Sequence, residues 1–166
     1  GGASRSAYRI HEAINRCSSD YKSQFFSATI QDSNLNVDYS PTKLEKYTGM
    51  LKSSIVSNLV RKVTSSEEMV SINLINSKWP SRINSLSPDL INLHWICAEM
   101  MSIADIRKFE MPIVWTMHDM WPFSGASHIP RFNDNGLRIE NASFKKKYLD
   151  DWMSSRKRKL IGRNIT

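Results

Sequence analysis

Two histidines stand at equivalent points in the sequence, each at the end of an apolar segment. His94 belongs to the segment 89–96 (DLINLHWI), and His118 follows the segment 112–117 (PIVWTM). In an open parallel sheet, ligands bind beyond the carboxyl ends of the strands. An imidazole at that edge can hydrogen-bond a hydroxyl or a phosphate near neutral pH. The two positions therefore predict a shared site, against the alternative that each histidine is a satisfied structural residue.

The residues that follow each histidine add further candidates. Trp95 comes directly after the first, and Asp119, Trp121 and Phe123 come after the second. Asp119 either orients the preceding imidazole or caps the next turn. The rings of Trp121 and Phe123 either stack on a sugar ring or an apolar acceptor, or pack their loop against the core.

A glycine pair at the start of the chain offers a different kind of ligand contact. Gly1 and Gly2 precede a segment in which Ala7, Ile10 and Ile14 have the i, i+3, i+7 spacing of a helix. A glycine turn that leads into a helix presents backbone N–H groups to an anion, most often a phosphate. We expect this turn to open on the same edge of the sheet as the two histidines.

The elements needed to position these residues alternate along the chain. Alternation of strands and helices predicts an α/β domain with a mostly parallel sheet and helices on both faces. A chain of 166 residues has the length of a single domain. Strand-like segments cover 21–30, 69–74, 89–96 and 112–117. Helical segments cover 41–63, 102–109 and 144–160, and the segment 77–88 contains a short helix.

The positive charge is concentrated near the end of the chain. Residues 144–166 contain eight Lys or Arg and two Asp, so they carry +6 of the net +7. A nucleic-acid-binding domain would place its charge on a folded face with interleaved aromatics, so nucleic acid is not an expected partner. The basic segment is either a solvated helix face or a surface attracted to an anionic membrane.

Cysteine usage and hydropathy indicate a cytoplasmic protein. Cys17 and Cys97 lie far apart without metal-type spacing, so each is expected to be a free thiol in a reducing compartment and no metal site is expected. The sequence has no run of eighteen apolar residues and no signal peptide at its visible start. The expected location is cytoplasmic, with peripheral contact at the inner membrane face as an extension.

Three stretches together resemble one known family. SINLINSKWPSRINSLSPDLINLHWI and IVWTMHDMWPFSGASHI are similar to the amino-terminal domain of bacterial family 4 glycosyltransferases, in particular the group that makes colanic acid and other exopolysaccharides. GGASRSAYRIHEAI resembles the segment after the first strand of that domain. The resemblance covers roughly residues 1–18, 69–129 and 145–166. Ala126 and Ser127 replace a Gly-Cys pair common in that group, whereas His128 is retained.

The resemblance implies a retaining enzyme of the GT-B type, in which two Rossmann-like domains face each other across a cleft. It implies that this chain is the acceptor-side domain, cut at both ends, and that a carboxy-terminal domain holds most of the nucleotide-sugar donor. The acceptor would be a glycan or a lipid-linked glycan, and neither a cofactor nor a metal is implied. His118 would contact the transferred sugar or stabilise charge near its anomeric carbon. Substrate contacts are implied for Gly1, Gly2, His94, Trp95, Asp119, Trp121, Phe123 and His128.

Two other functions are compatible with the same residues. One is a binding module of the same fold without chemistry of its own. The other is a basic interaction protein that works through residues 144–166. The nearly neutral remainder of the chain and the two histidine-ended strands count against the second.

Overall fold

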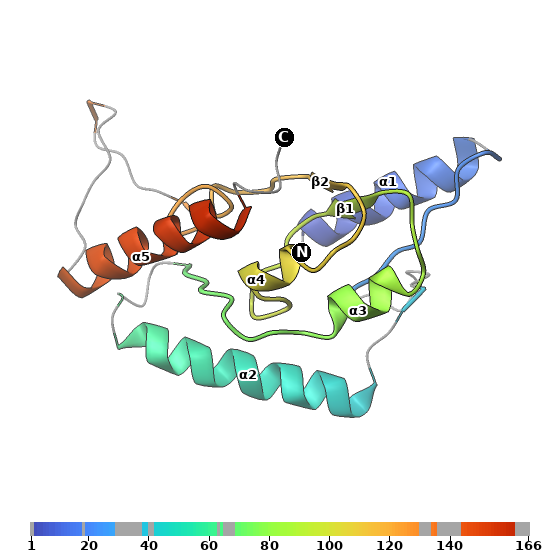
Figure 1. Ribbon diagram of the computed structural model, residues 1–166. Helices are drawn as coiled ribbons and strands as arrows, with labels where there is room; N and C mark the ends of the chain where they lie inside the picture. The colour runs from blue at the N-terminus through green and yellow to red at the C-terminus, as the bar shows by residue number, and fades with distance from the viewer. Residues whose placement is uncertain are drawn as a thin grey trace. The chain divides into compact units, whose positions relative to one another are not determined.

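The structure is a computed structural model that describes most of the chain (Figure 1). The residues described are 2–17, 19–28, 38–39, 42–62, 64, 69–129, 134–135 and 144–161. They form α1 (Gly2–Cys17), α2 (Lys43–Arg61), α3 (Trp79–Asn84), β1 (Ile91–Leu93), α4 (Ile103–Ile106), β2 (Ile113–Trp115) and α5 (Phe144–Ile161). The chain divides into two units, Gly1–Leu51 and Lys52–Thr166, which are described separately.

In the first unit, a side chain of α1 holds the segment that follows the helix. Asn15 acts like a strand partner, because its amide oxygen accepts from the Ser23 N–H at 2.7 Å and its Nδ2 donates to the Ser23 carbonyl at 3.0 Å. Tyr8, His11 and Phe25 pack their rings together with centroids 5.5–5.8 Å apart. Of the strand predicted over 21–30, the described part forms only a single bridge, between Phe26 and Tyr39.

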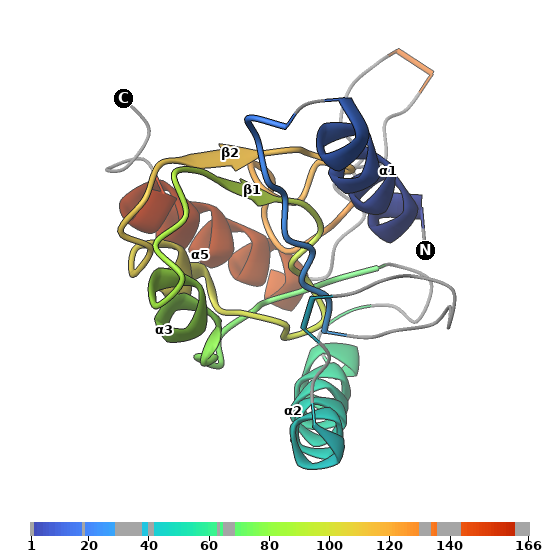
Figure 2. The same ribbon diagram turned by 90° about the vertical axis from the view of Figure 1, so that its right-hand side faces the viewer.

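In the second unit, β1 and β2 form a two-stranded parallel sheet in the register Ile91↔Ile113, Asn92↔Val114 and Leu93↔Trp115. Figures 1 and 2 show the strands side by side, with α3 and α5 on the same side of them. A mixture of helices with a parallel sheet agrees with the predicted α/β class. Both strands are shorter than the predicted segments, because only three residues of each complete the ladder of backbone hydrogen bonds.

The core of the second unit lies where α4 and α5 meet. Met101, Ile103 and Met153 are each at most 1% exposed. α4 begins with a capping box, in which Ser102 and Asp105 each accept a hydrogen bond from the other's backbone N–H. The buried Asp105 carboxylate also accepts from the Ser77 N–H, so it ties the segment before α3 to the start of α4.

The strand predicted over 69–74 is not formed. Val70 makes one antiparallel bridge to Ser127, and the segment is then interrupted at Asn73, whose φ is 44°. The Asn73 side chain is fully buried and donates to the carbonyls of Ile96 and Met101 at 2.8 and 3.0 Å. The left-handed backbone conformation directs the Asn73 side chain across the core. Its side-chain hydrogen bonds take the place of the backbone hydrogen bonds that a strand would have made here.

Two further features concern solvent and membrane. Among the described helices, none combines the length and the apolar content needed to cross a membrane. The two cysteines are both free thiols, Cys17 exposed and Cys97 buried. Burial, followed by the nearby Asp119, raises the pKa of the Cys97 thiol.

Candidate functional site

His94 and His118 meet at the carboxyl ends of β1 and β2. The His94 Nδ1 lies 2.8 Å from the His118 Nε2, and the ring centroids are 5.1 Å apart. Two hydrogen bonds connect the chain segments between the strands and this pair. The Thr116 N–H donates to the Leu93 carbonyl at 2.8 Å, and the Trp115 indole N–H donates to the His94 carbonyl at 3.1 Å. The prediction that the two histidines share one edge of the sheet is confirmed.

The short nitrogen-to-nitrogen distance limits the protonation of this pair. One of the two facing nitrogens must donate and the other must accept, so they cannot both carry a proton. Burial, followed by the charge of His118, lowers the pKa of His94. His118 is the more exposed partner, and with its Nε2 engaged it has Nδ1 available for a ligand. The pair can therefore present one oriented hydrogen-bonding nitrogen to solvent.

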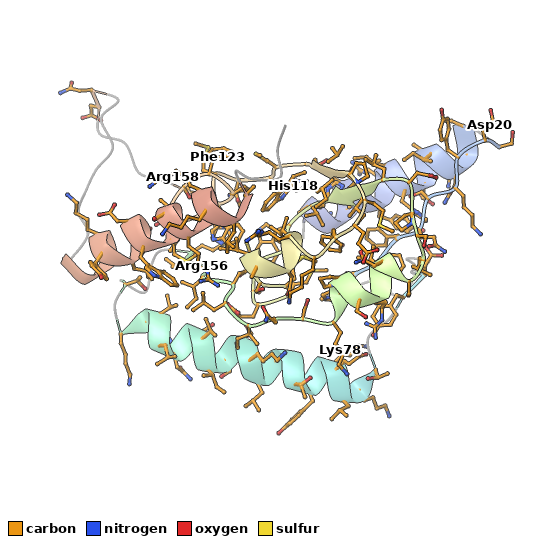
Figure 3. The ribbon with its side chains drawn as sticks, viewed as in Figure 1. Asp20, Lys78, His118, Phe123, Arg156 and Arg158 are labelled. Atoms are coloured by element: carbon orange, nitrogen blue, oxygen red, sulfur yellow. The ribbon has the colours of Figure 1, made fainter. Side chains whose placement is uncertain are left out.

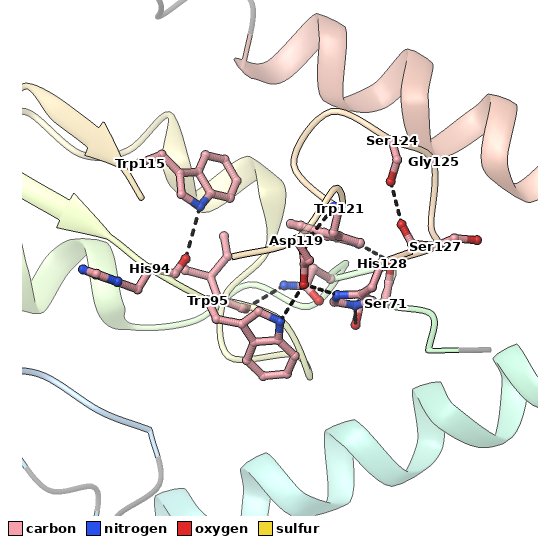
Figure 4. Close-up of polar contacts among 12 residues, drawn as sticks. Ser71, His94, Trp95, Trp115, Asp119, Trp121, Ser124, Gly125, Ser127 and His128 are labelled. Atoms are coloured by element: carbon pink, nitrogen blue, oxygen red, sulfur yellow. Dashed lines mark hydrogen bonds and ion pairs between the residues drawn. The ribbon is translucent and has the colours of Figure 1, made fainter. Parts of the chain in front are cut away.

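Asp119 bonds to neither histidine of this pair. Its Oδ2 accepts from the Trp95 indole at 3.1 Å and lies 2.6 Å from the Nδ1 of His128, while its Oδ1 accepts from the Trp121 N–H at 2.9 Å (Figure 4). Of the two predicted roles, capping the next turn is confirmed. The other, orienting the imidazole of His118, is not what the structure shows, because the carboxylate is directed into the loop.

His128 lies in the interior, 1% exposed, with its Nε2 2.9 Å from the Ser71 hydroxyl. The order Ser71, His128, Asp119 is that of a nucleophile, base and acid. However, Ser71 is only 8% exposed, so its hydroxyl is enclosed in the interior with His128. We therefore infer that the Ser71–His128–Asp119 hydrogen bonds have a positioning role. They hold the Asp119 carboxylate in place, and this carboxylate in turn holds the Trp95 indole. In this arrangement His128 does not meet a ligand directly, contrary to the role that the resemblance implies.

The three predicted aromatic residues have different environments. Trp121 is 1% exposed and donates its indole N–H to the Ser71 carbonyl at 2.8 Å, so for this residue the core-packing alternative is correct. Phe123 is 58% exposed, so the same alternative is wrong for it. Trp95 is 37% exposed while its N–H is held by Asp119. Figure 3 shows His118 and Phe123 on the same side of the second unit.

A buried lysine that the sequence analysis missed fixes the loop beneath these aromatics. The Lys157 ammonium donates to the carbonyls of Trp121, Ser124 and Gly125 and lies 3.7 Å from the centre of the Trp121 ring. The residue is 3% exposed, and this burial lowers its pKa to about 7, although Asp119 and Asp150 act in the opposite direction. In the sequence Lys157 stands in a run of basic residues, so nothing there separates it from solvated neighbours.

A second contact from α5 secures the same loop. The Asp150 carboxylate accepts from the Ala126 N–H at 2.7 Å. A Cβ at Gly125 would lie 2.4 Å from the Asp150 Oδ1 and 2.7 Å from its Cα, so only glycine fits there. α5 therefore has a buried face, and the predicted solvated basic face lies opposite it, where Lys147, Arg158 and Lys159 are exposed.

A strained turn links β1 to α4 directly after the His94–Trp95 pair. Ala98 and Glu99 both have positive φ, 55° and 59°. The buried Glu99 carboxylate holds this conformation by accepting from the N–H groups of Leu74 and Ile75 at 3.1 and 3.2 Å. Backbone conformations of this kind persist only where surrounding contacts impose them. Sequence reasoning did not find this turn, since the residues contain no glycine.

The glycine turn is only partly covered by the structure. Gly1 lies outside the described residues, and Gly2 is the first residue of α1, in the first unit. Its convergence with the histidines of the second unit stays a prediction. Within the described ranges, no group of three or more His, Cys, Asp or Glu side chains is placed to hold a metal ion.

No protein-family model, curated protein or solved structure matches this chain.

Proposed function

We propose that this chain is the amino-terminal, Rossmann-like acceptor-side domain of a retaining GT-B glycosyltransferase. The reaction would transfer a sugar from a nucleotide-sugar donor to a glycan or lipid-linked acceptor in surface polysaccharide synthesis. The single observation that carries the proposal is the His94–His118 pair at the ends of two adjacent parallel strands. That edge is where α/β sheets bind their ligands. The resemblance of SPDLINLHW and WTMHDMWPFSG to the family supports the same assignment.

In this proposal His118 acts at the reacting centre and His94 is a positioning residue. The available nitrogen of His118 hydrogen-bonds a hydroxyl of the transferred sugar or an oxygen of the leaving phosphate. Because His94 already holds the ring, little reorganisation is needed when charge develops in the transition state. No cofactor is required, since the nucleotide sugar is itself a substrate.

Trp95 would form part of the acceptor side of the same site. Its indole N–H is anchored to Asp119, so its partly exposed ring is held in one orientation. A rigid aromatic face binds the apolar face of a sugar ring with little loss of side-chain entropy. The fold proposed for the whole domain extends the two strands into a larger parallel sheet with helices on both faces.

The test measures sugar transfer by the full-length enzyme with a panel of nucleotide sugars. His118→Ala should lower kcat by about 100-fold, in the range of a lost transition-state contact, with a smaller change in KM. Met117→Ala is a matched control, because Met117 is the adjacent residue and is 50% exposed. An unchanged kcat in the His118 variant would remove this residue from the reacting centre. If no nucleotide sugar is turned over, the proposed reaction itself is wrong.

A non-catalytic binding module is the second candidate, favoured by one observation. Asp119 and His128 are occupied by internal hydrogen bonds, so the histidine pair is the one ionisable group of the predicted set that remains open. Such a module would bind a glycan without turnover. Titration of the chain with glycans, followed by NMR shifts of the His118 ring, tests binding, and glycan binding without turnover of any nucleotide sugar by the full-length protein would favour the module.

A further inference from the structure

The two imidazoles at the sheet edge face each other head-on. The His94 Nδ1 and the His118 Nε2 are 2.8 Å apart, the ring centroids are 5.1 Å apart, and the ring planes differ by 31°. The centroid distance exceeds the nitrogen distance by the width of one imidazole ring, so both nitrogens lie close to the line between the ring centres. This is the arrangement of a nearly linear N–H···N hydrogen bond, in which one proton lies between the two rings.

A metal ion does not fit between the same two nitrogens. A metal–nitrogen bond is about 2.0 Å long, so a tetrahedral ion would hold the nitrogens roughly 3.3 Å apart and would need both to point at a common third position. Here they are closer and point at each other. Within the described ranges, no further His, Cys, Asp or Glu side chain joins them in a group of three. The shared occupant is therefore a proton.

The number of protons that this pair can hold is limited by its geometry. A neutral imidazole carries one proton and an imidazolium carries two. With two protons in total, one lies between the rings, and one of the two outward nitrogens, His94 Nε2 or His118 Nδ1, donates while the other accepts. A third proton gives the pair one positive charge and makes both outward nitrogens donors. A fourth has to occupy a facing nitrogen, where it meets the proton between the rings and breaks the hydrogen bond.

The surroundings of the pair also oppose the fourth proton. Burial, followed by the charge of His118, lowers the pKa of His94. Both causes act against a second positive charge, because a like charge and a poorly solvated position each disfavour the charged form. The third and fourth protons are therefore taken up in separate steps that belong to the pair as a whole.

The single positive charge has no internal counter-charge. Among the described residues, no carboxylate forms an ion pair with either histidine. Asp119 follows His118 in the sequence, but its oxygens bond to Trp95, Trp121 and His128.

The other ionisable groups of the adjoining elements are engaged as well. Glu99 bonds to the backbone between 74 and 75, His128 to Ser71, and both Asp150 and Lys157 to the loop 121–126. A charged pair with two outward N–H donors and no internal partner is complementary to an anion from outside.

We propose that the His94–His118 pair is an oxyanion site controlled by its proton count: it binds a tetrahedral oxyanion such as a phosphate group while it holds three protons, and releases it when it holds two or four. Hydrogen bonds from a charged donor are roughly twice as strong as neutral ones. The pair lies at the carboxyl ends of β1 and β2, the edge where α/β sheets bind ligands. The proposal concerns the site of the proposed function, but anion binding needs no sugar transfer.

The experiment measures sulfate affinity by calorimetry between about pH 4 and 9, together with NMR shifts of the histidine rings. Sulfate keeps its charge over this range, whereas a phosphate monoester titrates at about pH 6. The variants are His94→Gln and His94→Gln/His118→Gln. His11→Gln is the matched control, because the ring of His11 belongs to α1 and bonds to Ser23 at 3.1 Å. Circular dichroism at each pH checks that the variants are folded.

The sulfate affinity of the wild type should pass through a maximum, about tenfold or more above the values on either side. His94→Gln should keep the alkaline side of the maximum and lose the acid side, because a glutamine carbonyl accepts the His118 proton but does not gain one itself. The double variant should show no maximum, and His11→Gln should bind like the wild type. Affinity that rises steadily on acidification of the wild type, or a maximum that persists in the double variant, would overturn the proposal.

The source of the oxyanion is distinguished at the pH of the maximum. Inorganic phosphate tests a free anion, and a nucleoside diphosphate tests the phosphate of a larger ligand. Tighter binding of one of them, lost in the double variant, identifies the source. Equal binding of both by the wild type and the double variant would contradict the proposal. Because no sugar is transferred in these measurements, their failure leaves the proposed reaction to its own test.

Discussion

His118 and His128 lie in the same loop region, and hydrogen bonding gives them opposite roles. His118 bonds to His94 at the sheet edge and remains exposed, whereas His128 is enclosed between Asp119 and Ser71. Both histidines were plausible ligand contacts in the sequence. The deciding difference is burial, which a sequence does not display for a residue in an irregular loop.

Lys157 should give the stability of the protein a distinctive dependence on pH. Burial lowers its pKa to about 7, below its ordinary value of 10.5, so the unfolded chain holds this proton more tightly than the folded chain. Where the unfolded state binds more protons, stability rises with pH. The contribution of Lys157 to the free energy of unfolding should therefore rise between about pH 7 and 10.5, by up to about 1.4 kcal/mol per pH unit.

Urea unfolding at several pH values between about 7 and 9 provides the measurement. Lys157→Met should flatten the curve of unfolding free energy against pH, and Lys159→Met, at an exposed position of the same helix, should leave it unchanged. Parallel curves for the wild type and the Lys157 variant would show that this lysine does not titrate in the folded protein.

At the level of secondary structure, α5 acts as a clamp on the loop that follows β2. Lys157 and Asp150, about two turns apart on the helix, bond to backbone groups of residues 121–126. The loop in turn contains Trp121, whose indole bonds to Ser71. The aromatic side of the candidate site therefore depends on a helix that contributes no predicted site residue.

Two glycines provide a matched test of this clamp. At Gly125 an added Cβ would meet Asp150, including its backbone Cα at 2.7 Å, whereas at Gly49 nothing lies within 4 Å. Gly125→Ala should lower the free energy of unfolding by about 1–3 kcal/mol, because α5 or the loop must shift. Gly49→Ala should raise it by roughly 0.5–1 kcal/mol, as expected within a helix. Both are measured by urea unfolding, and equal effects would show that α5 does not constrain this loop.

Helices were easier to predict than strands for a physical reason. The spacing of Leu44 to Leu59 predicted α2 closely, since helix formation depends on local periodicity. The local residue pattern of the segment 69–74 also predicted a strand, but Asn73 has a left-handed backbone conformation and directs its side chain into the core. A strand forms only by hydrogen bonding to another segment of the chain, and the sequence does not show which segment that is. The histidine pair was predictable because it needs only two parallel strands, whereas the burial of Lys157 depends on how α5 packs.

At the scale of the whole molecule, the proposed function requires a second domain. A GT-B site is assembled from two facing domains, and positioning of the reacting atoms requires both. The 166 residues alone should therefore release no nucleotide from any nucleotide sugar in the presence of acceptor. The measurement is chromatographic detection of free nucleotide, with the full-length enzyme as the positive control. Turnover by the isolated chain would show that its own residues complete a catalytic site.

The contrast between the two thiols makes the chain a convenient subject for chemical probes. A maleimide should react readily with the exposed Cys17 and slowly with Cys97, which is buried and whose pKa is raised. One equivalent of label should therefore attach to the native protein and a second only after unfolding. A fluorophore can thus be placed on α1 without mutagenesis, and the stoichiometry of labelling, read by mass spectrometry, reports the opening of the second unit.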